Sequence, residues 1–143
     1  MILHENPSDA ELRRILAKSM TIAVVGCSDR EERDSYRIAR FLQERGHRIV
    51  PINPSCSSIL GEPCYARLDL VPSDRRIDMI NVFRKPKFVY QHLGEAIARG
   101  VAVAWLQLDV IDHDAAQMAV AAGCTVIMDR CVAIEYRRLF PSS

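Results

Sequence analysis

The stretch TIAVVGCS at residues 21–28 decides the fold. A short apolar run that ends at a glycine is typical of a strand buried on both faces of a parallel sheet. Residues 35–45 then show helical spacing, with Ile38, Phe41 and Leu42 on one face and Gly46 as the stop signal. A buried strand followed by an amphipathic helix is the repeating unit of parallel α/β proteins.

The same alternation continues along the chain. Further strands are expected at 48–52, 77–83, 101–106 and 125–128, and further helices at about 8–19, 87–99, 112–122 and 132–139. Residues 55–76, rich in Ser, Pro and Gly, predict no more than one short helix near Leu68. The pattern predicts an α/β, Rossmann-like three-layer domain with a five-stranded parallel sheet and helices on both faces. Residues 1–143 are expected to form one such domain.

Composition excludes several classes of function. With 19 basic and 18 acidic side chains the formal net charge is +1, which gives no general attraction for nucleic acid. No stretch reaches the ~18 apolar residues of a membrane span, and the first residues do not resemble an export signal. Neither the five cysteines nor the four histidines have metal-binding spacing. We therefore expect a cytoplasmic protein without metal, membrane or nucleic-acid partners, and its oligomeric state stays open.

The first candidate site follows the first strand, because ligands of open α/β sheets bind beyond the carboxyl ends of the strands. Gly26 would let the backbone pass close to a ligand, and the next helix would offer its free N–H groups to phosphate. Ser28, Arg33 and Ser35 add donors for anionic oxygen. The alternatives are that Gly26 is only a turn and Ser35 only a helix cap.

Two other strand ends carry suggestive residues. Asn53 stands where dinucleotide sites usually have a carboxylate, and a neutral residue there tolerates a phosphorylated ribose. Arg84 and Lys85 beside Phe83 offer cations for phosphate and an aromatic wall for a base, although such a loop can also be merely solvated. The first loop is neither G-x-G-x-x-G nor a Walker A sequence.

A family resemblance is carried by IAVVGCS (22–28), RDSY (33–36), VPINP (50–54), GE (61–62), DMINVFR (78–84), WLQ (105–107) and MDRC (128–131). Over about residues 10–140 the chain resembles the small, stand-alone CoA-binding proteins, whose fold is similar to the CoA-binding domain of the succinyl-CoA synthetase alpha subunit. The resemblance implies a coenzyme A site. By this resemblance the path of phosphate and pantetheine is lined by Gly26, Cys27, Ser28, Arg33, Ser35 and Tyr36. The adenosine would be flanked by Asn53, Pro54, Phe83, Arg84 and Lys85, and Gln107 would approach the pantetheine arm. Asp34, where many relatives are expected to have proline, departs from the pattern.

No catalytic residue is predicted, since the phosphohistidine loop and partner subunit of the synthetase are not visible. We expect a module that binds coenzyme A or an acyl-CoA as a carrier or sensor. The alternatives are an NAD(P)-dependent oxidoreductase and a subunit of a larger acyl-CoA enzyme.

Cys131 is a candidate redox thiol. It follows Arg130 at the start of the last helix, and both features favour the thiolate form. The alternative is a buried thiol with no role beyond packing at the helix start.

Overall fold

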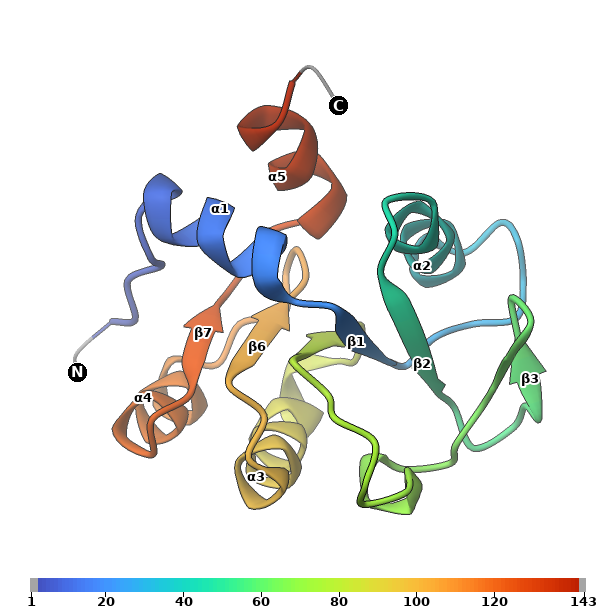
Figure 1. Ribbon diagram of the computed structural model, residues 1–143. Coiled ribbons are helices and arrows are strands. Elements are labelled where there is room, and N and C mark those ends of the chain that lie inside the picture. The colour runs from blue at the N-terminus through green and yellow to red at the C-terminus, as the bar shows by residue number, and fades with distance from the viewer. Residues whose placement is uncertain (1–2, 142–143) are drawn as a thin grey trace.

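A five-stranded parallel sheet forms the centre of the molecule (Figure 1). The computed structural model describes residues 3–141. In spatial order the strands are β2 (Arg48–Ile52), β1 (Thr21–Val25), β5 (Met79–Val82), β6 (Val103–Leu106) and β7 (Thr125–Ile127). The chain steps outward from β1 to β2 and then returns past β1 to β5, so the strand order reverses between β1 and β5. Val25 is in register with both Ile52 and Val82, so these three strands end level at one edge.

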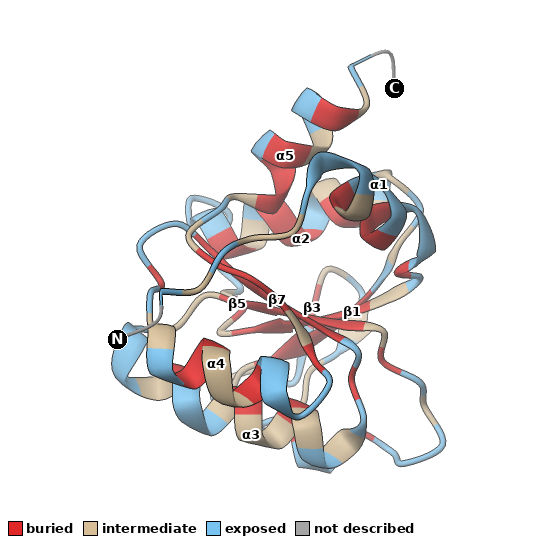
Figure 2. Ribbon diagram, turned by 90° about the vertical axis from the view of Figure 1, so that its left-hand side faces the viewer, coloured by how far each residue is buried: buried red, intermediate tan, exposed pale blue. Residues whose placement is uncertain are grey.

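Helices cover both faces of the sheet, which confirms the predicted three-layer α/β fold (Figure 2). One layer contains α1 (Asp9–Lys18), α2 (Asp34–Glu44) and α5 (Val132–Leu139), and the other contains α3 (Val89–Arg99) and α4 (His113–Ala121). Along β1 the side chains alternate between the layers: Ala23 and Val25 pack toward α3 and α4, while Ile22 and Val24 pack toward α1, α2 and α5. The apolar run of β1 is therefore continuous because both of its faces are covered.

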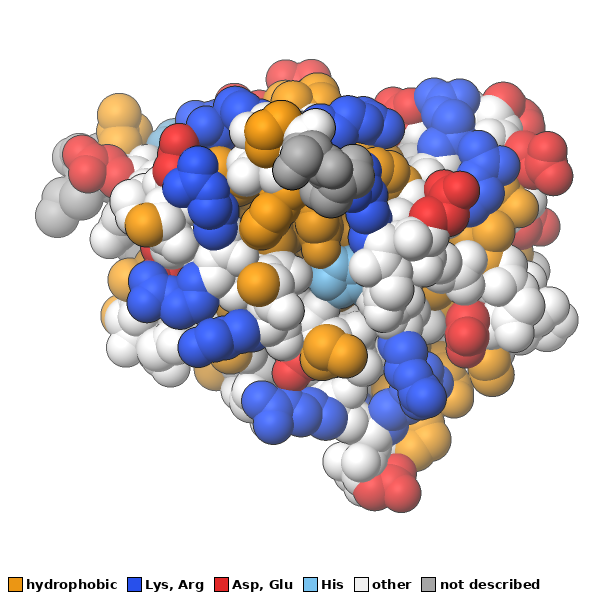
Figure 3. All heavy atoms as spheres, turned by 45° about the horizontal axis from the view of Figure 1, so that its top comes forward, with side chains coloured by type: hydrophobic (Ala, Val, Ile, Leu, Met, Phe, Trp, Pro, Cys, Tyr) orange, Lys and Arg blue, Asp and Glu red, His pale blue; other side chains and the backbone are white. Residues whose placement is uncertain are grey.

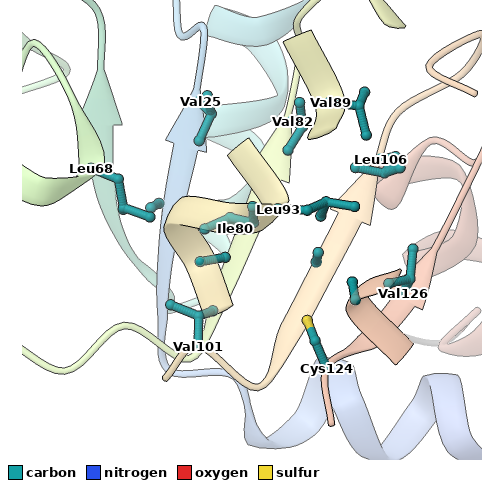
Figure 4. Close-up of a cluster of buried hydrophobic side chains, with 14 of the residues drawn as sticks. Val25, Leu68, Ile80, Val82, Val89, Leu93, Val101, Leu106, Cys124 and Val126 are labelled. Carbon is teal, nitrogen blue, oxygen red and sulfur yellow. The ribbon is translucent and has the colours of Figure 1, made fainter. Parts of the chain in front are cut away.

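The core beneath α3 shows how the layers hold together. Ile80 and Val82 of β5 and Leu106 of β6 pack against Val89 and Leu93 of α3, and all five are fully buried (Figure 4). Full burial of such a side chain stabilises the fold by about 1.5–3 kcal/mol. This packing fixes α3 beside the carboxyl ends of β1 and β5.

The segment between β2 and β5 contains more structure than the sequence predicts. The short helix near Leu68 is confirmed as a 3-10 turn, η1 (Leu68–Leu70), but a two-stranded hairpin of β3 (Ser58–Ile59) and β4 (Glu62–Pro63) was not predicted. Its turn places Leu60 at φ 53° and Gly61 at φ 79°. Hairpin turns of this kind favour Asn or Asp before the glycine, so a leucine there hides the signal.

Arg99, in the last turn of α3, anchors this segment. Its guanidinium donates to the carbonyl oxygens of Leu68, Val71, Pro72 and Arg75, at distances of 2.6–3.3 Å. One side chain thus satisfies four backbone acceptors of a stretch that has no α-helix of its own.

Several element boundaries differ from the sequence prediction by one or two residues. The strand expected at 77–83 begins only at Met79, and the carboxylate of the preceding Asp78 accepts the backbone N–H groups of Met20 and Thr21, both at 3.0 Å. A second short 3-10 turn, η2 (Pro86–Phe88), precedes α3. Among residues 3–141 no helix is long and apolar enough to cross a bilayer.

The outer surface of the α1, α2 and α5 layer combines cations with aromatic rings. Figure 3 shows Lys and Arg side chains around a central group of hydrophobic side chains. The guanidinium groups of Arg45 and Arg137 lie 4.9 and 4.8 Å from the ring centre of Phe41, and Tyr136 packs edge-on against that ring at 5.7 Å. His47 lies in the same cluster, between the carbonyl oxygen of Ser19 and the hydroxyl of Tyr136.

We expect His47 to make stability depend on pH. Burial lowers the pKa of His47 below its ordinary value of 6.5, although the contact with the Ser19 carbonyl opposes the shift. The unfolded chain then binds the proton more readily, so this contribution is complete above pH 6.5 and is lost as the pH falls below it. Thermal unfolding between about pH 7.5 and 5.5 should show a falling Tm, and His47→Asn should flatten the slope. An unchanged slope in the variant would assign the effect to other groups.

Candidate functional site

The chain crosses itself closely at Gly26, directly after β1. Gly26 has φ +84°, and a Cβ built there would lie 3.0 Å from the carbonyl oxygen of Phe83 and 3.0 Å from Cδ of Arg84. The Gly26 N–H also donates to the carbonyl oxygen of Ile52 at 3.0 Å. The turn predicted at Gly26 is present. The backbone after β5 passes so close that this position has no room for a side chain, with or without a ligand.

Gly26→Ala should therefore destabilise the fold more than a glycine substitution in open space. The left-handed conformation alone costs about 1–2 kcal/mol for an alanine, and the clash with Phe83 adds to this. Gly123→Ala is the matched control, because Gly123 has φ +92° with nothing within 4 Å of its added Cβ. Chemical denaturation should give the larger loss for Gly26→Ala. Equal losses would mean that the Phe83 loop moves away at no cost.

The loop after Gly26 is held by serine hydroxyls. The N–H of Ser28 donates to Oγ of Ser35 at 2.9 Å, and the N–H of Arg30 donates to Oγ of Ser28 at 3.0 Å. Helix α2 begins at Asp34 with Arg33 as its N-cap residue and with no side chain capping it. The alternative interpretation of Ser35 as the helix cap is thus wrong: the buried hydroxyl braces the loop. The first N–H groups of α2 have no capping side chain, which suits an anion.

Asn53, after β2, braces the same loop from the other side. Its Nδ2 donates to the carbonyl oxygen of Cys27 at 2.8 Å, and its Oδ1 accepts the N–H of Ser55 at 2.8 Å. The Cys27 side chain is fully buried among core residues, and burial raises the pKa of its thiol to about 12. Only the main chain of Cys27 can face a ligand, and its thiol is inert.

Three adjoining cavities follow this edge of the sheet. The α3 cavity, about 310 Å³, is lined by residues that include Gly26, Pro54, Arg84, Phe88 and His92. The loop cavity, about 480 Å³, is lined among others by Gly26, Ser28, Arg33, Ser35, Asn53 and Phe83. The α5 cavity, about 560 Å³, is lined among others by Phe83, Arg84, Lys85, Gln107 and Cys131. Shared walls at Gly26, Phe83 and Arg84 connect the three.

The structure therefore brings together most of the predicted site residues. Only Cys27 and Tyr36 among them line none of these three cavities. Tyr36 is half-buried against the core of its layer, with the guanidinium of Arg40 at 5.9 Å from the ring centre. Cys131, half-buried directly before α5, does line the α5 cavity, and its redox role stays a prediction.

Phe88 and His92 are among the residues of the α3 cavity that the sequence analysis missed. The guanidinium of Arg84 stacks 4.3 Å from the ring centre of Phe88, so Phe88 supplies an aromatic surface that the sequence analysis assigned to Phe83 alone. His92, which the sequence places on a helix with no partner, bonds through Nδ1 to Glu95 at 2.8 Å. Its Nε2 is buried and has no hydrogen-bond partner among residues 3–141. Residues three positions apart on a helix are neighbours, so the sequence spacing of His92 and Glu95 could have predicted this pair.

A polar network beneath the α5 cavity was also missed. The fully buried Asn81 of β5 donates through Nδ2 to the carbonyl oxygen of Trp105 at 3.2 Å and to Oε1 of Gln107 at 3.0 Å. Oε1 of Gln107 also accepts the N–H of Val132 at 3.1 Å. Trp105 Nε1 donates to the carbonyl oxygen of Arg130 at 3.0 Å. These bonds tie the ends of β5 and β6 to the start of α5.

The edge carries charged side chains of both signs. Arg30 and Arg33 line the loop cavity together with Glu32, and Arg84 and Lys85 line the α5 cavity together with Asp109. Asp34 lies at the same edge but is paired with Arg37. Within residues 3–141 no three or more His, Cys, Asp or Glu side chains are grouped so that they could hold a metal ion. The arginine and lysine side chains of the edge offer donors to a small anion, and the apolar walls of the α5 cavity suit an uncharged part of the same ligand.

Residues 20–137 match the family model of the CoA binding domain. The chain belongs to this CoA-binding domain family. It is also 36% identical over 132 residues to the uncharacterized protein YneT of Bacillus subtilis (strain 168), covering 92% of this chain and 96% of YneT. The family therefore agrees with the resemblance in the sequence.

Solved structures share the fold of this CoA-binding domain. A hypothetical protein from Pyrococcus horikoshii OT3 superposes with a TM-score of 0.89 at 31% identity, over 97% of this chain and 99% of that one. The dinucleotide-forming acetyl-coenzyme A synthetase 1 of Ca. Korarchaeum cryptofilum, in its apo form, superposes with a TM-score of 0.65 at 23% identity, over 75% of this chain and 25% of the synthetase. At that identity the synthetase shares only the fold.

Proposed function

We propose that this protein binds coenzyme A as a carrier or sensor module and catalyses no reaction on it. The observation that carries the proposal is the set of three adjoining cavities at the point where the strand order reverses, which is where open α/β sheets bind ligands. The family supports the identity of the ligand. The side chains of Ser35 and Asn53 are hydrogen-bonded to the protein itself, which supports binding rather than catalysis.

The order of the cavities matches the order of groups along coenzyme A. In the proposal the α3 cavity takes the adenosine, because Pro54, Phe88 and Arg84 offer apolar, aromatic and planar cationic surfaces. The loop cavity takes the diphosphate at the uncapped start of α2, beside Arg30 and Arg33. The α5 cavity takes the pantetheine arm. The walls shared at Gly26 and Phe83 let one extended ligand pass through all three.

Coenzyme A should raise the melting temperature, and NAD should not. No carboxylate stands at Asn53 to take the ribose hydroxyls of NAD, and the Asn53 amide is already bonded to the Cys27 carbonyl and the Ser55 N–H. At a free concentration of ~100 times the dissociation constant, the ligand should stabilise the fold by about 2.7 kcal/mol. A thermal-shift series with coenzyme A, NAD and NADP tests this. Stabilisation by NAD or NADP without stabilisation by coenzyme A would favour an oxidoreductase instead.

The 3′-phosphate of coenzyme A should contribute through Arg84. A charge-assisted hydrogen bond contributes roughly 1.5–3 kcal/mol, so dephospho-CoA should bind on the order of ten- to a hundredfold more weakly. Arg84→Met keeps an unbranched apolar stem over Gly26 and should bind both ligands alike. Lys18→Ala, on α1, is the control that removes an exposed positive charge elsewhere. If calorimetry finds no preference for coenzyme A in the wild type, Arg84 faces solvent in the complex.

A further inference from the structure

The side-chain amide of Gln107 has only one possible orientation. Its Oε1 accepts two hydrogen bonds, from Asn81 Nδ2 at 3.0 Å and from the backbone N–H of Val132 at 3.1 Å. A backbone N–H is always a donor, so the amide group cannot turn its NH₂ toward Val132 without placing donor against donor. The oxygen therefore points into the protein and its acceptor capacity is filled.

The other end of the same amide is a free donor. Gln107 Nε2 makes no hydrogen bond to any described residue. A fully buried atom in that situation would be unsatisfied, but the only such side-chain N and O atoms in the described chain are Asn81 Oδ1 and His92 Nε2. Gln107 Nε2 is therefore not fully buried and can be reached from the cavity. Since Gln107 lines the α5 cavity, its N–H groups are available to a ligand there. A neutral N–H in an apolar surrounding suits an uncharged carbonyl oxygen.

The exposed walls of the α5 cavity are mainly apolar. Ile38, Val110 and Ile134 line it together with Leu108. Leu108 and Ile134 are each 52% exposed, so this cavity leaves apolar surface open to water. Its charged side chains are of both signs, with Asp34 and Asp109 set against Arg84 and Lys85. The cavity therefore offers a covering for a hydrocarbon chain and no excess of one charge.

We propose that the α5 cavity holds the acyl end of a short-chain aliphatic acyl-CoA, with the thioester carbonyl accepting a hydrogen bond from Gln107 Nε2. The inference rests on the proposed function, because it names the form of coenzyme A that the same site takes. The two amide carbonyls of the pantetheine arm lie farther from the reactive end of coenzyme A. Free coenzyme A ends in a thiol, which offers no carbonyl acceptor at that end and leaves Leu108 and Ile134 uncovered. Asn81 is a positioning residue, since it acts on the ligand only through Oε1 of Gln107.

The chain-length dependence of affinity tests the aliphatic wall. Calorimetry should compare coenzyme A with acetyl-, butanoyl- and hexanoyl-CoA. Each buried methylene should raise affinity by about fourfold until the cavity is full. Ile134→Ser should flatten this dependence. Val120→Ser, at a residue that is 46% exposed on α4 and lines none of the three cavities, should leave it unchanged.

The hydrogen bond from Gln107 is tested by removing only the carbonyl. S-butyl-CoA has a thioether in place of the thioester of butanoyl-CoA. Wild-type protein should bind butanoyl-CoA about fivefold more tightly than S-butyl-CoA, as expected for one neutral hydrogen bond. Gln107→Glu keeps an oxygen for Asn81 and Val132 but has no N–H group, so it should lose this preference. Circular dichroism shows whether the variant folds, and the Ile134→Ser series decides the question if it does not.

The outcomes separate the two proposals. If none of these ligands binds, the proposed function is wrong. If coenzyme A binds and the affinity does not rise with the length of the acyl chain, coenzyme A binding stands and the acyl site is overturned. Tighter binding of free coenzyme A than of butanoyl-CoA would overturn it in the same way.

Discussion

The carbonyl oxygen of Phe83 passes so close to Gly26 that no side chain fits between them. This contact lies where the chain leaves β1 for one layer of helices and leaves β5 for the other. Because β1 and β5 end level and the chain leaves them toward opposite faces of the sheet, a crevice forms between the two loops. The contact between Gly26 and Phe83 lies at the bottom of this crevice. The loop cavity lies on one side of Gly26 and the α3 cavity on the other, so both depend on this crossing.

Two polar side chains around the crevice form hydrogen bonds with the protein backbone. Ser35 fixes the Ser28 backbone, and Asn53 holds the Cys27 carbonyl. Each of these bonds is worth only about 0.5–1.5 kcal/mol of stability, but together they set the shape of the loop before a ligand arrives. A loop that is already ordered loses less conformational entropy on binding. This explains how a site with few free side chains can still recognise a ligand, because backbone N–H groups and the start of α2 remain available to it.

Hydrophobic periodicity was sufficient to predict the five strands, their covering helices and the edge at which the candidate site lies. It could not predict the direction of side chains in turns: Cys27 follows Gly26, and the left-handed glycine turns its thiol into the core. It also missed the hairpin, whose turn uses Leu60 at positive φ. Phe88 and His92 belong to the approach to α3 and to α3 itself, and they reach the site only because α3 packs beside β1 and β5. Such a placement depends on tertiary packing, which local sequence does not encode.

Asn81 is a polar residue within an apolar strand, and the sequence analysis could have predicted from this that it takes part in a buried hydrogen-bond network. An amide inside the apolar run of β5 must find hydrogen-bond partners, since burying it without them costs several kcal/mol. Its Nδ2 finds Gln107 and the Trp105 carbonyl, but its Oδ1 has no partner in the described chain. An aliphatic residue at this position would avoid the cost of about 1–3 kcal/mol that the unpartnered oxygen carries. It would also leave Gln107 bonded only to Val132, so one of the two hydrogen bonds that hold its amide in place would be lost. A polar group retained at such a cost is best explained by what it positions, and here that is the Gln107 amide, the proposed donor in the α5 cavity.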